Sequence, residues 1–210
     1  MTGWGEQELA AARAGLAVLQ APALATLTSK RLNAVPGYVS LMRDLQRADL
    51  RSAAAADVRR RFNGFYGVRR APDWQGLFYA EFESAKRSKA DAPDLFAAVL
   101  TALRAEGRTE ASFASKLVAS VRPDRVIIDS IVARFVRRCC GLRRRGRSVE
   151  AAVDYYVDLQ VLMDLLLPSP EVEAWLAVFN ETFDDAGATE IAPMKKLDFL
   201  IWAGEGQGGT

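Results

Sequence analysis

The chain of 210 residues contains no histidine, and its only two cysteines, Cys139 and Cys140, are adjacent. Without histidine, Ser-His-Asp triads, Cys-His nucleophiles and the usual histidine-bearing zinc sites cannot form. Two neighbouring thiols supply neither a disulfide framework nor the four thiolates of an iron–sulfur cluster. Any catalysis must therefore use carboxylates, Lys, Tyr, Ser, Cys or an oxygen-bound metal.

Phosphate-binding glycine motifs and membrane signals are also missing. The sequence has neither a Gly-x-x-x-x-Gly-Lys-Ser/Thr loop nor a Gly-x-Gly-x-x-Gly turn, so nucleotide hydrolysis and nicotinamide chemistry are disfavoured. No uninterrupted apolar stretch approaches the roughly 20 residues that span a bilayer, and the N-terminus lacks a basic flank followed by an apolar core. We expect a soluble, cytoplasmic, monomeric protein that needs no cofactor, no metal and no membrane.

Helical periodicity runs through nearly every segment, and no alternation of β-branched and aromatic residues indicates a sheet. Half of the residues are hydrophobic, which is enough for a substantial core. The fold class is therefore all-α. We expect one compact domain over 1–203, divided into lobes at about 30–92 and 93–150 that the N- and C-terminal helices complete, and a disordered tail over 204–210. The first helix should end or restart at Pro22.

The net charge of +2 is unevenly distributed. Residues 111–149 carry ten Lys and Arg against two acids, or +8, whereas residues 150–210 carry two Lys against twelve acids, or −10. A concentrated positive segment suits a polyanion, because each phosphate contact releases counterions. Alternatively, the acidic C-terminal part neutralises the basic middle within the molecule.

Six arginines cluster between residues 137 and 147, and we expect them to contact DNA phosphates. The alternative is a solvated helix end, where the dipole favours cations. The six are Arg137, Arg138, Arg143, Arg144, Arg145 and Arg147.

A lysine on an apolar helix, Lys116, precedes by thirteen residues an aspartate at an expected helix start, Asp129, with Pro123 between them. This order, over about residues 95–136, resembles the core of the helix-hairpin-helix DNA glycosylase superfamily, which includes 8-oxoguanine glycosylase and endonuclease III-like members. The resemblance implies a two-lobed helical bundle with a central cleft, acting on double-stranded DNA that contains a modified base. The Leu-Pro-Gly-x-Gly hairpin of the superfamily is absent, and residues 106–110 stand in its place. The arginine cluster would then have to hold the DNA backbone.

The resemblance implies catalytic roles for Asp129 and Lys116. A carboxylate near the anomeric carbon would stabilise the positive charge that develops on the deoxyribose as the base leaves. A lysine partly desolvated among apolar neighbours would have a lowered pKa and could attack the same carbon, adding a lyase step. The structural alternatives are that Asp129 only caps a helix and that Lys116 only extends along an apolar surface to solvent.

A glycosylase must also extrude a base and hold it. Two asparagines beside cationic residues at expected loops, Asn33 and Asn63, are candidate wedges. The resemblance extends weakly to the last helix, where Asp198 and Trp202 lie four residues apart on one face. The candidate base-pocket residues, several of which could equally belong to the core, are Phe65, Tyr66, Trp74, Tyr79, Asp198 and Trp202.

The resemblance thus implies a DNA glycosylase that flips and excises a modified base, with an added lyase step if Lys116 attacks. By analogy alone, the target could be the hypermodified cytosine of phage genomes, which would make the protein an antiviral defence enzyme. The alternative is a nucleic-acid-binding protein with the same fold and no catalysis. A third hypothesis, a protein–protein adaptor with an acidic lobe, predicts no salt-dependent affinity for DNA.

Overall fold

The computed structural model describes residues 3–29, 33–104, 109–144 and 146–206, and within these ranges it is all-helical, without strands. Three short 3-10 helices (Ala53–Ala55, Asp184–Ala186 and Ala188–Glu190) accompany the α-helices. The α-helices are α1 (Glu6–Leu27), α2 (Ala34–Arg47), α3 (Ala56–Tyr66), α4 (Pro72–Arg87), α5 (Ala92–Ala102), α6 (Ala111–Val121), α7 (Ser130–Cys140), α8 (Val149–Leu166), α9 (Pro170–Thr182) and α10 (Pro193–Glu205).

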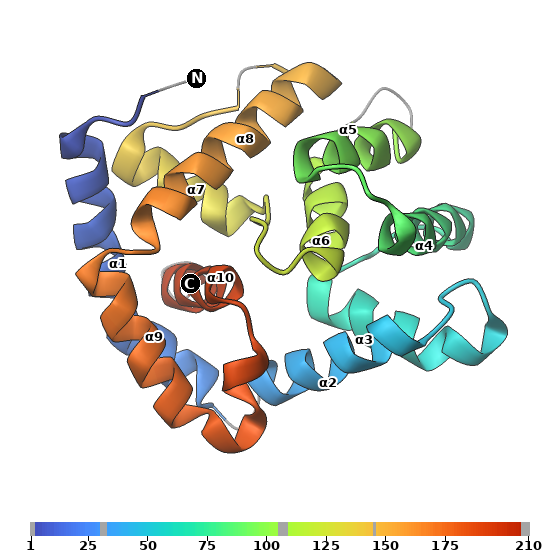
Figure 1. The fold of residues 1–210 in the computed structure, drawn as a ribbon, viewed down its shortest axis with the longest axis horizontal. Coiled ribbons are helices and arrows are strands. Elements are labelled where there is room, and N and C mark those ends of the chain that lie inside the picture. Colours follow the sequence, from blue (N-terminus) through green and yellow to red (C-terminus); the bar gives the residue numbers. More distant parts are fainter. Residues whose placement is uncertain (1–2, 30–32, 105–108, 145, 207–210) are drawn as a thin grey trace.

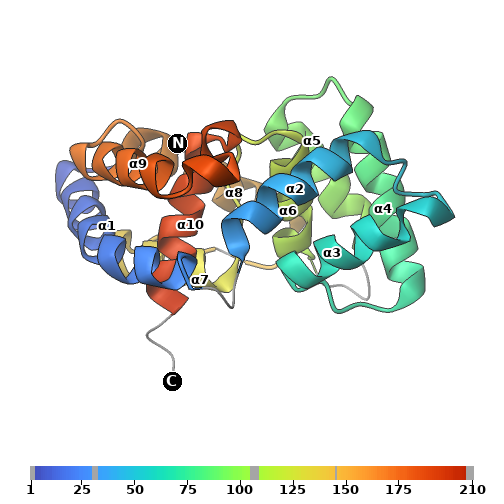
Figure 2. The same cartoon turned by 90° about the horizontal axis from the view of Figure 1, so that it is seen from below.

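The two ends of the chain pack together. Helix α10 lies against α1, α7 and α9, while α2 to α6 form a second group on the other side of the molecule (Figure 1). Helix α8 packs against both α1 and α5 and so joins the two groups. The view from below shows the same separation, with α1, α9 and α10 on one side and α3, α4 and α5 on the other (Figure 2).

Helix starts follow local rules. The side chains of Asp91, Ser148 and Ser169 each accept a hydrogen bond from a backbone N–H in the first turn of α5, α8 and α9. Such caps satisfy donors that have no partner within the helix. Helix α7 ends at Gly141, whose φ of 67° lies in the left-handed region that glycine adopts without strain. Sequence rules therefore locate these boundaries well.

Helix α1 corrects one prediction, because Pro22 lies inside it and the helix continues to Leu27. Proline removes the donor that would pair with the carbonyl of Val18. Val18 is 75% exposed, so water can take the place of that donor. By length and composition alone, α1 could cross a membrane, with a mean hydropathy of 1.3 over 18 residues. Core helices of soluble proteins share this composition, and the cytoplasmic location stays a prediction.

The C-terminal end of α10 corrects a second prediction, the disordered tail that was expected from residue 204. Gly204 is helical and buried against α1, and the helix continues to Glu205. A Cβ atom at Gly204 would lie 2.8 Å from Cβ of Leu19 and 3.0 Å from its carbonyl oxygen. Only glycine permits this close approach of the two helices. Residues 207–210 of the expected tail lie outside the described residues.

Candidate active site

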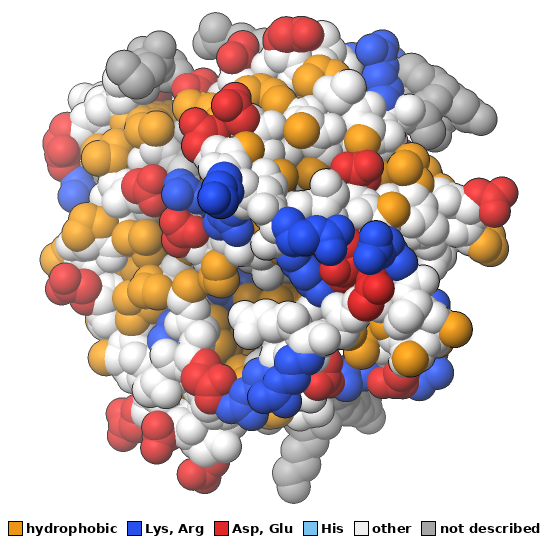
Figure 3. Space-filling view, turned by 45° about the vertical axis from the view of Figure 1, so that its right-hand side comes forward, with side chains coloured by type: hydrophobic (Ala, Val, Ile, Leu, Met, Phe, Trp, Pro, Cys, Tyr) orange, Lys and Arg blue, Asp and Glu red, His pale blue; other side chains and the backbone are white. Residues whose placement is uncertain are grey.

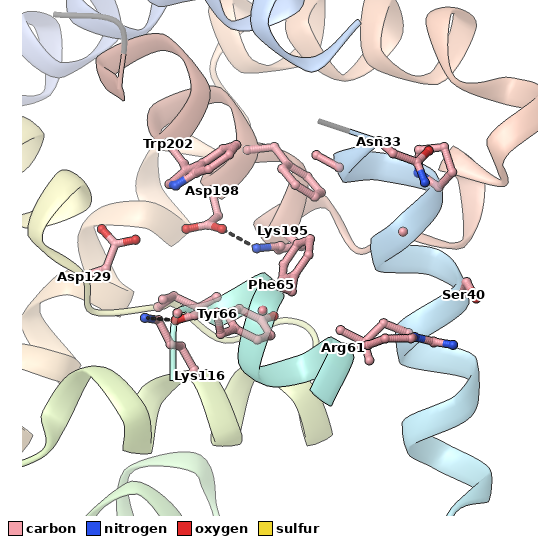
Figure 4. Close-up of a pocket in the computed structure, with 18 residues that line it drawn as sticks. Asn33, Ser40, Arg61, Phe65, Tyr66, Lys116, Asp129, Lys195, Asp198 and Trp202 are labelled. Carbon is pink, nitrogen blue, oxygen red and sulfur yellow. Dashed lines mark hydrogen bonds and ion pairs between the residues drawn. The ribbon is translucent and has the colours of Figure 1, made fainter. Parts of the chain in front are cut away.

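A cavity of about 980 Å³ lies between α2, α3, α6, α10 and the start of α7. Its volume is at the upper end of the range for small-molecule sites, roughly 300–1,000 Å³. The close-up shows Asp129, Asp198 and Lys116 at one end and Ser40 and Arg61 at the other, with Lys195 and Phe65 between them (Figure 4). The cavity therefore brings together residues far apart in the sequence, several of them ionisable.

Asp129 both caps α7 and lines the cavity. Its Oδ1 accepts hydrogen bonds from the backbone N–H groups of Ile131, at 2.9 Å, and Val132, at 2.8 Å. Both bonds use the same oxygen, so within the described ranges Oδ2 accepts no hydrogen bond. The predicted cap is confirmed, and it leaves one carboxylate oxygen for another partner.

Burial and charge both act on Asp129. Desolvation raises the pKa of its carboxyl group above the ordinary value, and the nearby carboxylate of Asp198 raises it further. The two backbone hydrogen bonds and the ammonium group of Lys116 act in the opposite direction but do not offset this increase. Carboxyl groups with perturbed pKa values inside a cavity are typical of functional sites.

Lys116 reaches the cavity from α6. Its Nζ donates a hydrogen bond to the carbonyl oxygen of Tyr66 at 3.1 Å and lies 5.6 Å from the ring centroid of Phe113. Desolvation lowers its pKa, although the carboxylates of Asp129 and Asp198 act against this shift. Partial burial thus increases the fraction of neutral, nucleophilic amine at a given pH.

The segment between α6 and α7 holds Asp129 in position. The hydroxyl group of Ser115, on the same helix as Lys116, accepts a hydrogen bond from the N–H of Ile128 at 2.9 Å. The side chain of Gln160 accepts one from the N–H of Val126 at 3.0 Å. These buried contacts tie the residues just before Asp129 to α6 and α8, so the carboxylate and the lysine are held in a fixed relation.

Helix α10 supplies the opposite wall of the cavity with Lys195, Asp198 and Trp202. Asp198 and Trp202 were predicted for the base pocket, and both line the cavity. Lys195 was missed: it is only 7% exposed, and its Nζ lies 2.5 Å from Oδ2 of Asp198. The three-residue spacing of this pair on one helix was the available sequence signal, because such residues are neighbours on a helix surface.

The predicted aromatic residues divide into two groups. Phe65 and Tyr66, at the end of α3, line the cavity. Trp74 and Tyr79 do not, and their assignment to the base pocket is corrected. Trp74 stacks on Phe78 at 5.4 Å between ring centroids, and the hydroxyl group of Tyr79 donates to Oδ1 of Asn63 at 2.6 Å. Periodic aromatics on an amphipathic helix pack into the core, and α4 follows this rule.

The two candidate wedges also differ. Asn33 lies at the cavity, immediately before α2, with a φ of 42° in the left-handed region. Asn63 was expected in a loop but lies within α3, where its amide nitrogen donates to Oε1 of Gln75 at 2.8 Å. Because both ends of this side chain are already hydrogen-bonded, Asn63 is not placed to enter a duplex, and the prediction is corrected.

The arginine cluster is not a single loop. Arg137 and Arg138 belong to the last turn of α7, while Arg143, Arg144 and Arg147 follow Gly141. Arg145 lies outside the described residues. None of the five described arginines lines the cavity.

The described arginines also differ in their contacts. Arg138 forms an ion pair with Glu205 of α10, and Arg144 bonds to the hydroxyl group of Thr109. Arg137, Arg143 and Arg147 are exposed. The acidic C-terminal part thus pairs with one exposed arginine of the cluster, Arg138, and three other arginines are also exposed.

Surface charges of both signs alternate on the face shown in Figure 3, where patches of Lys and Arg side chains have Asp and Glu side chains among them. Ion pairs between such residues include Arg61, at the cavity, with Asp44 at 2.7 Å, and Arg70 with Glu110 at 2.6 Å. Within the described ranges, no group of three or more His, Cys, Asp or Glu side chains is arranged to hold a metal ion.

The chain matches no protein-family model, no curated protein and no solved structure.

Proposed function

We propose that this protein is a DNA glycosylase of the helix-hairpin-helix type, in which Asp129 assists cleavage of an N-glycosidic bond and Lys116 acts as the nucleophile. One observation carries the proposal: Lys116 of α6 and Asp129 at the start of α7 line one cavity, and burial lowers the pKa of Lys116 and so favours its neutral amine. A neutral amine beside a carboxylate that has a free oxygen is the arrangement that base excision requires.

The reaction follows from these two groups. The neutral amine of Lys116 attacks C1′ of the deoxyribose; the C1′–N bond breaks, and its electron pair leaves with the base, which takes up a proton. The carboxylate of Asp129 stabilises the positive charge on the sugar during this step. Loss of the amine proton and opening of the sugar ring give a Schiff base. Removal of a proton from C2′ then expels the 3′ phosphate and nicks the strand.

The size of the cavity bears on the substrate. At about 980 Å³ it has room for more than an unsubstituted base, and its side away from Asp129 carries the polar side chains of Asn33, Ser40 and Arg61. This favours a base with a polar substituent, for which the hypermodified cytosine of phage DNA is the leading candidate. The proposal of an antiviral role depends on this substrate, because hypermodified cytosine would mark the DNA as that of a phage.

Borohydride trapping tests the proposal. Wild-type protein is incubated with abasic-site DNA and borohydride, beside Lys116→Met and the matched control Lys196→Met, which removes a buried lysine outside the cavity. We expect a covalent adduct with the wild type and the control, and none with Lys116→Met. Base release by mass spectrometry from DNA with 8-oxoguanine, uracil and glucosylated hydroxymethylcytosine identifies the substrate.

A non-catalytic nucleic-acid-binding protein is the second candidate, supported by the exposed arginines Arg137, Arg143 and Arg147, for which no ion pair is found within the described ranges. It predicts salt-dependent DNA affinity without an adduct and without release of any base. Absence of both affinity and adduct would contradict both functions.

A further inference from the structure

Lys195 is the most unusual residue of the cavity, because it is a lysine that is only 7% exposed. Lysine is almost never fully buried unless it is paired, since its charge must be removed from water. Lys195 is paired with Asp198 at 2.5 Å, and both residues line the cavity. The pair is therefore a charged feature inside the cavity, and the reaction proposed above does not use it.

Four aromatic rings surround the ammonium group of Lys195. Its Nζ lies 4.6 Å from the ring centroid of Phe199, 5.2 Å from Tyr38, 5.4 Å from Tyr66 and 5.5 Å from Phe65. Ring faces attract a cation without accepting a strong hydrogen bond. The rings thus fix the position of the ammonium group and leave its N–H donors for other partners.

The hydrogen bonds of Lys195 are incomplete. An ammonium group has three N–H donors. Within the described ranges, Lys195 gives one hydrogen bond, to Oδ2 of Asp198. Figure 4 shows Lys195 beside Phe65 near the middle of the cavity, with Asp198 on its side toward Asp129. Donors not used within the protein are thereby available at the place where an extruded base would stack.

The neighbouring lysine shows that this arrangement is specific. Lys196, on the same helix, is 5% exposed, and its Nζ donates to Oδ1 of Asn180 at 2.5 Å. It does not line the cavity. Two adjacent lysines of similar burial thus have different surroundings: Lys196 has a neutral partner, Asn180, whereas Lys195 lies in a cavity with a charged partner and aromatic walls.

We infer that Lys195 recognises the extruded base: its ammonium group donates a hydrogen bond to an acceptor atom on the base edge while Asp198 accepts one from an adjacent N–H. The aromatic residues Phe65 and Tyr66 stack on the base. Lys195 is thus a specificity residue, and Lys116 remains the nucleophile because its amine, unlike that of Lys195, is not held in an ion pair. This inference rests on the proposed function, since it concerns the base that the same site would release.

The experiment compares base release, which requires recognition of the base, with trapping on abasic-site DNA, which has no base to recognise. Lys195→Met, an unbranched uncharged replacement, and the control Lys196→Met are compared in single-turnover base release and in borohydride trapping on abasic-site DNA. Release uses the panel of modified bases described above, and the base that the wild type releases fastest is analysed in detail. Because the Lys195 charge contributes to the lowered pKa of Lys116, trapping is measured at pH values where its rate has reached a plateau.

We expect Lys195→Met to slow base release by about 10- to 100-fold, the loss typical of a hydrogen bond to a charged group, while abasic-site trapping persists. Lys196→Met should retain both. The double variant Lys195→Met, Asp198→Asn removes both charges of the pair, leaves neither partner unpaired, and should show the same selective loss. Thermal melting of each variant separates this result from misfolding.

Three outcomes would overturn the inference. If Lys195→Met lost base release and abasic-site trapping equally, Lys195 would have a structural role. If base release were unchanged, Lys195 would have no role in recognising the base. Trapping by the wild type without release of any base in the panel would refute base recognition and leave the lyase proposal standing. Failure of the wild type in both assays is different, because it would overturn the proposed function itself.

Discussion

Replacing Asp129 by asparagine separates its two roles, because asparagine can cap a helix but carries no charge. In the wild type, Oδ1 of Asp129 accepts hydrogen bonds from the N–H groups of Ile131 and Val132. Asn is as good an N-cap residue as Asp, so Asp129→Asn should keep both bonds. Asp129→Ala removes the cap as well as the charge. The two variants should therefore differ in stability, and both should lack the carboxylate that assists base release.

The magnitudes follow from the surroundings of the side chain. Loss of one group that stabilises charge in a transition state slows an enzyme by about 10²–10³-fold, and we expect this loss of base release in both variants. Loss of the cap costs about 1 kcal/mol, which lowers Tm by about 2–4 °C in a chain of this size. Because both variants remove the carboxyl group, this decrease is expected for Asp129→Ala relative to Asp129→Asn.

The pH dependence of stability gives a further check. The folded state raises the pKa of Asp129, so its contribution to stability is present at low pH and is lost as the pH rises through the raised value. Asp129→Asn has no carboxyl group to ionise, so this loss of stability with rising pH does not occur in the variant. Its Tm should therefore exceed that of the wild type near neutral pH, and the difference should vanish at a pH below the ordinary Asp pKa.

Single-turnover base release and thermal melting on the same preparations provide the measurements. An Asp129→Asn protein that melts like the wild type or higher and still releases the base at the wild-type rate would falsify the catalytic role. Such a protein would leave helix capping as the whole function of this residue.

Three further outcomes are expected. Asp198→Asn removes a carboxylate that raises the pKa of Asp129, so the acidic limb of the pH–rate profile for base release should move to lower pH; an unchanged limb would refute the coupling of the two acids. Gly204→Ala forces a methyl group against α1 and should lower the free energy of unfolding by about 1–3 kcal/mol, measured by chemical denaturation. Gly37→Ala is the control, because a Cβ atom there meets no atom within 4 Å, and it should not destabilise the protein. If Arg143 and Arg147 contact phosphates, replacing both by Gln should reduce the slope of log K against log salt by about 1.8, and an unchanged slope would show that DNA binds elsewhere.

Local rules account for what could be predicted from the sequence. The all-α class and most helix boundaries follow from periodicity and capping residues, and Asp129 is a cap because an aspartate before an apolar helical pattern satisfies the first N–H groups. Pro22 shows the limit of such rules. A proline disfavours a helix locally, yet α1 continues through it because packing against α10 outweighs that cost.

The composition of the candidate site could be predicted only in part. Periodicity marks Trp74 and Tyr79 as apolar-face residues of a helix, but it does not reveal that this face turns toward Phe78 and Asn63 rather than toward the cavity. Lys195 was missed for a related reason. Adjacent lysines usually face solvent, and nothing in their identity shows that one of them is enclosed by rings from α2, α3 and α10.

The sequence by itself determined the all-helical class, the position of Asp129 at a helix start and the presence of Lys116 on an apolar helix, since each depends on neighbours within one or two turns. Only the tertiary structure decided which side chains share the cavity. Helix α10, near the C-terminal end, brings Lys195 and Asp198 to face residues from α3 and α6. Desolvation and charge–charge effects depend on such contacts between distant segments, so the shifted pKa values of Asp129 and Lys116 arise only in the folded chain.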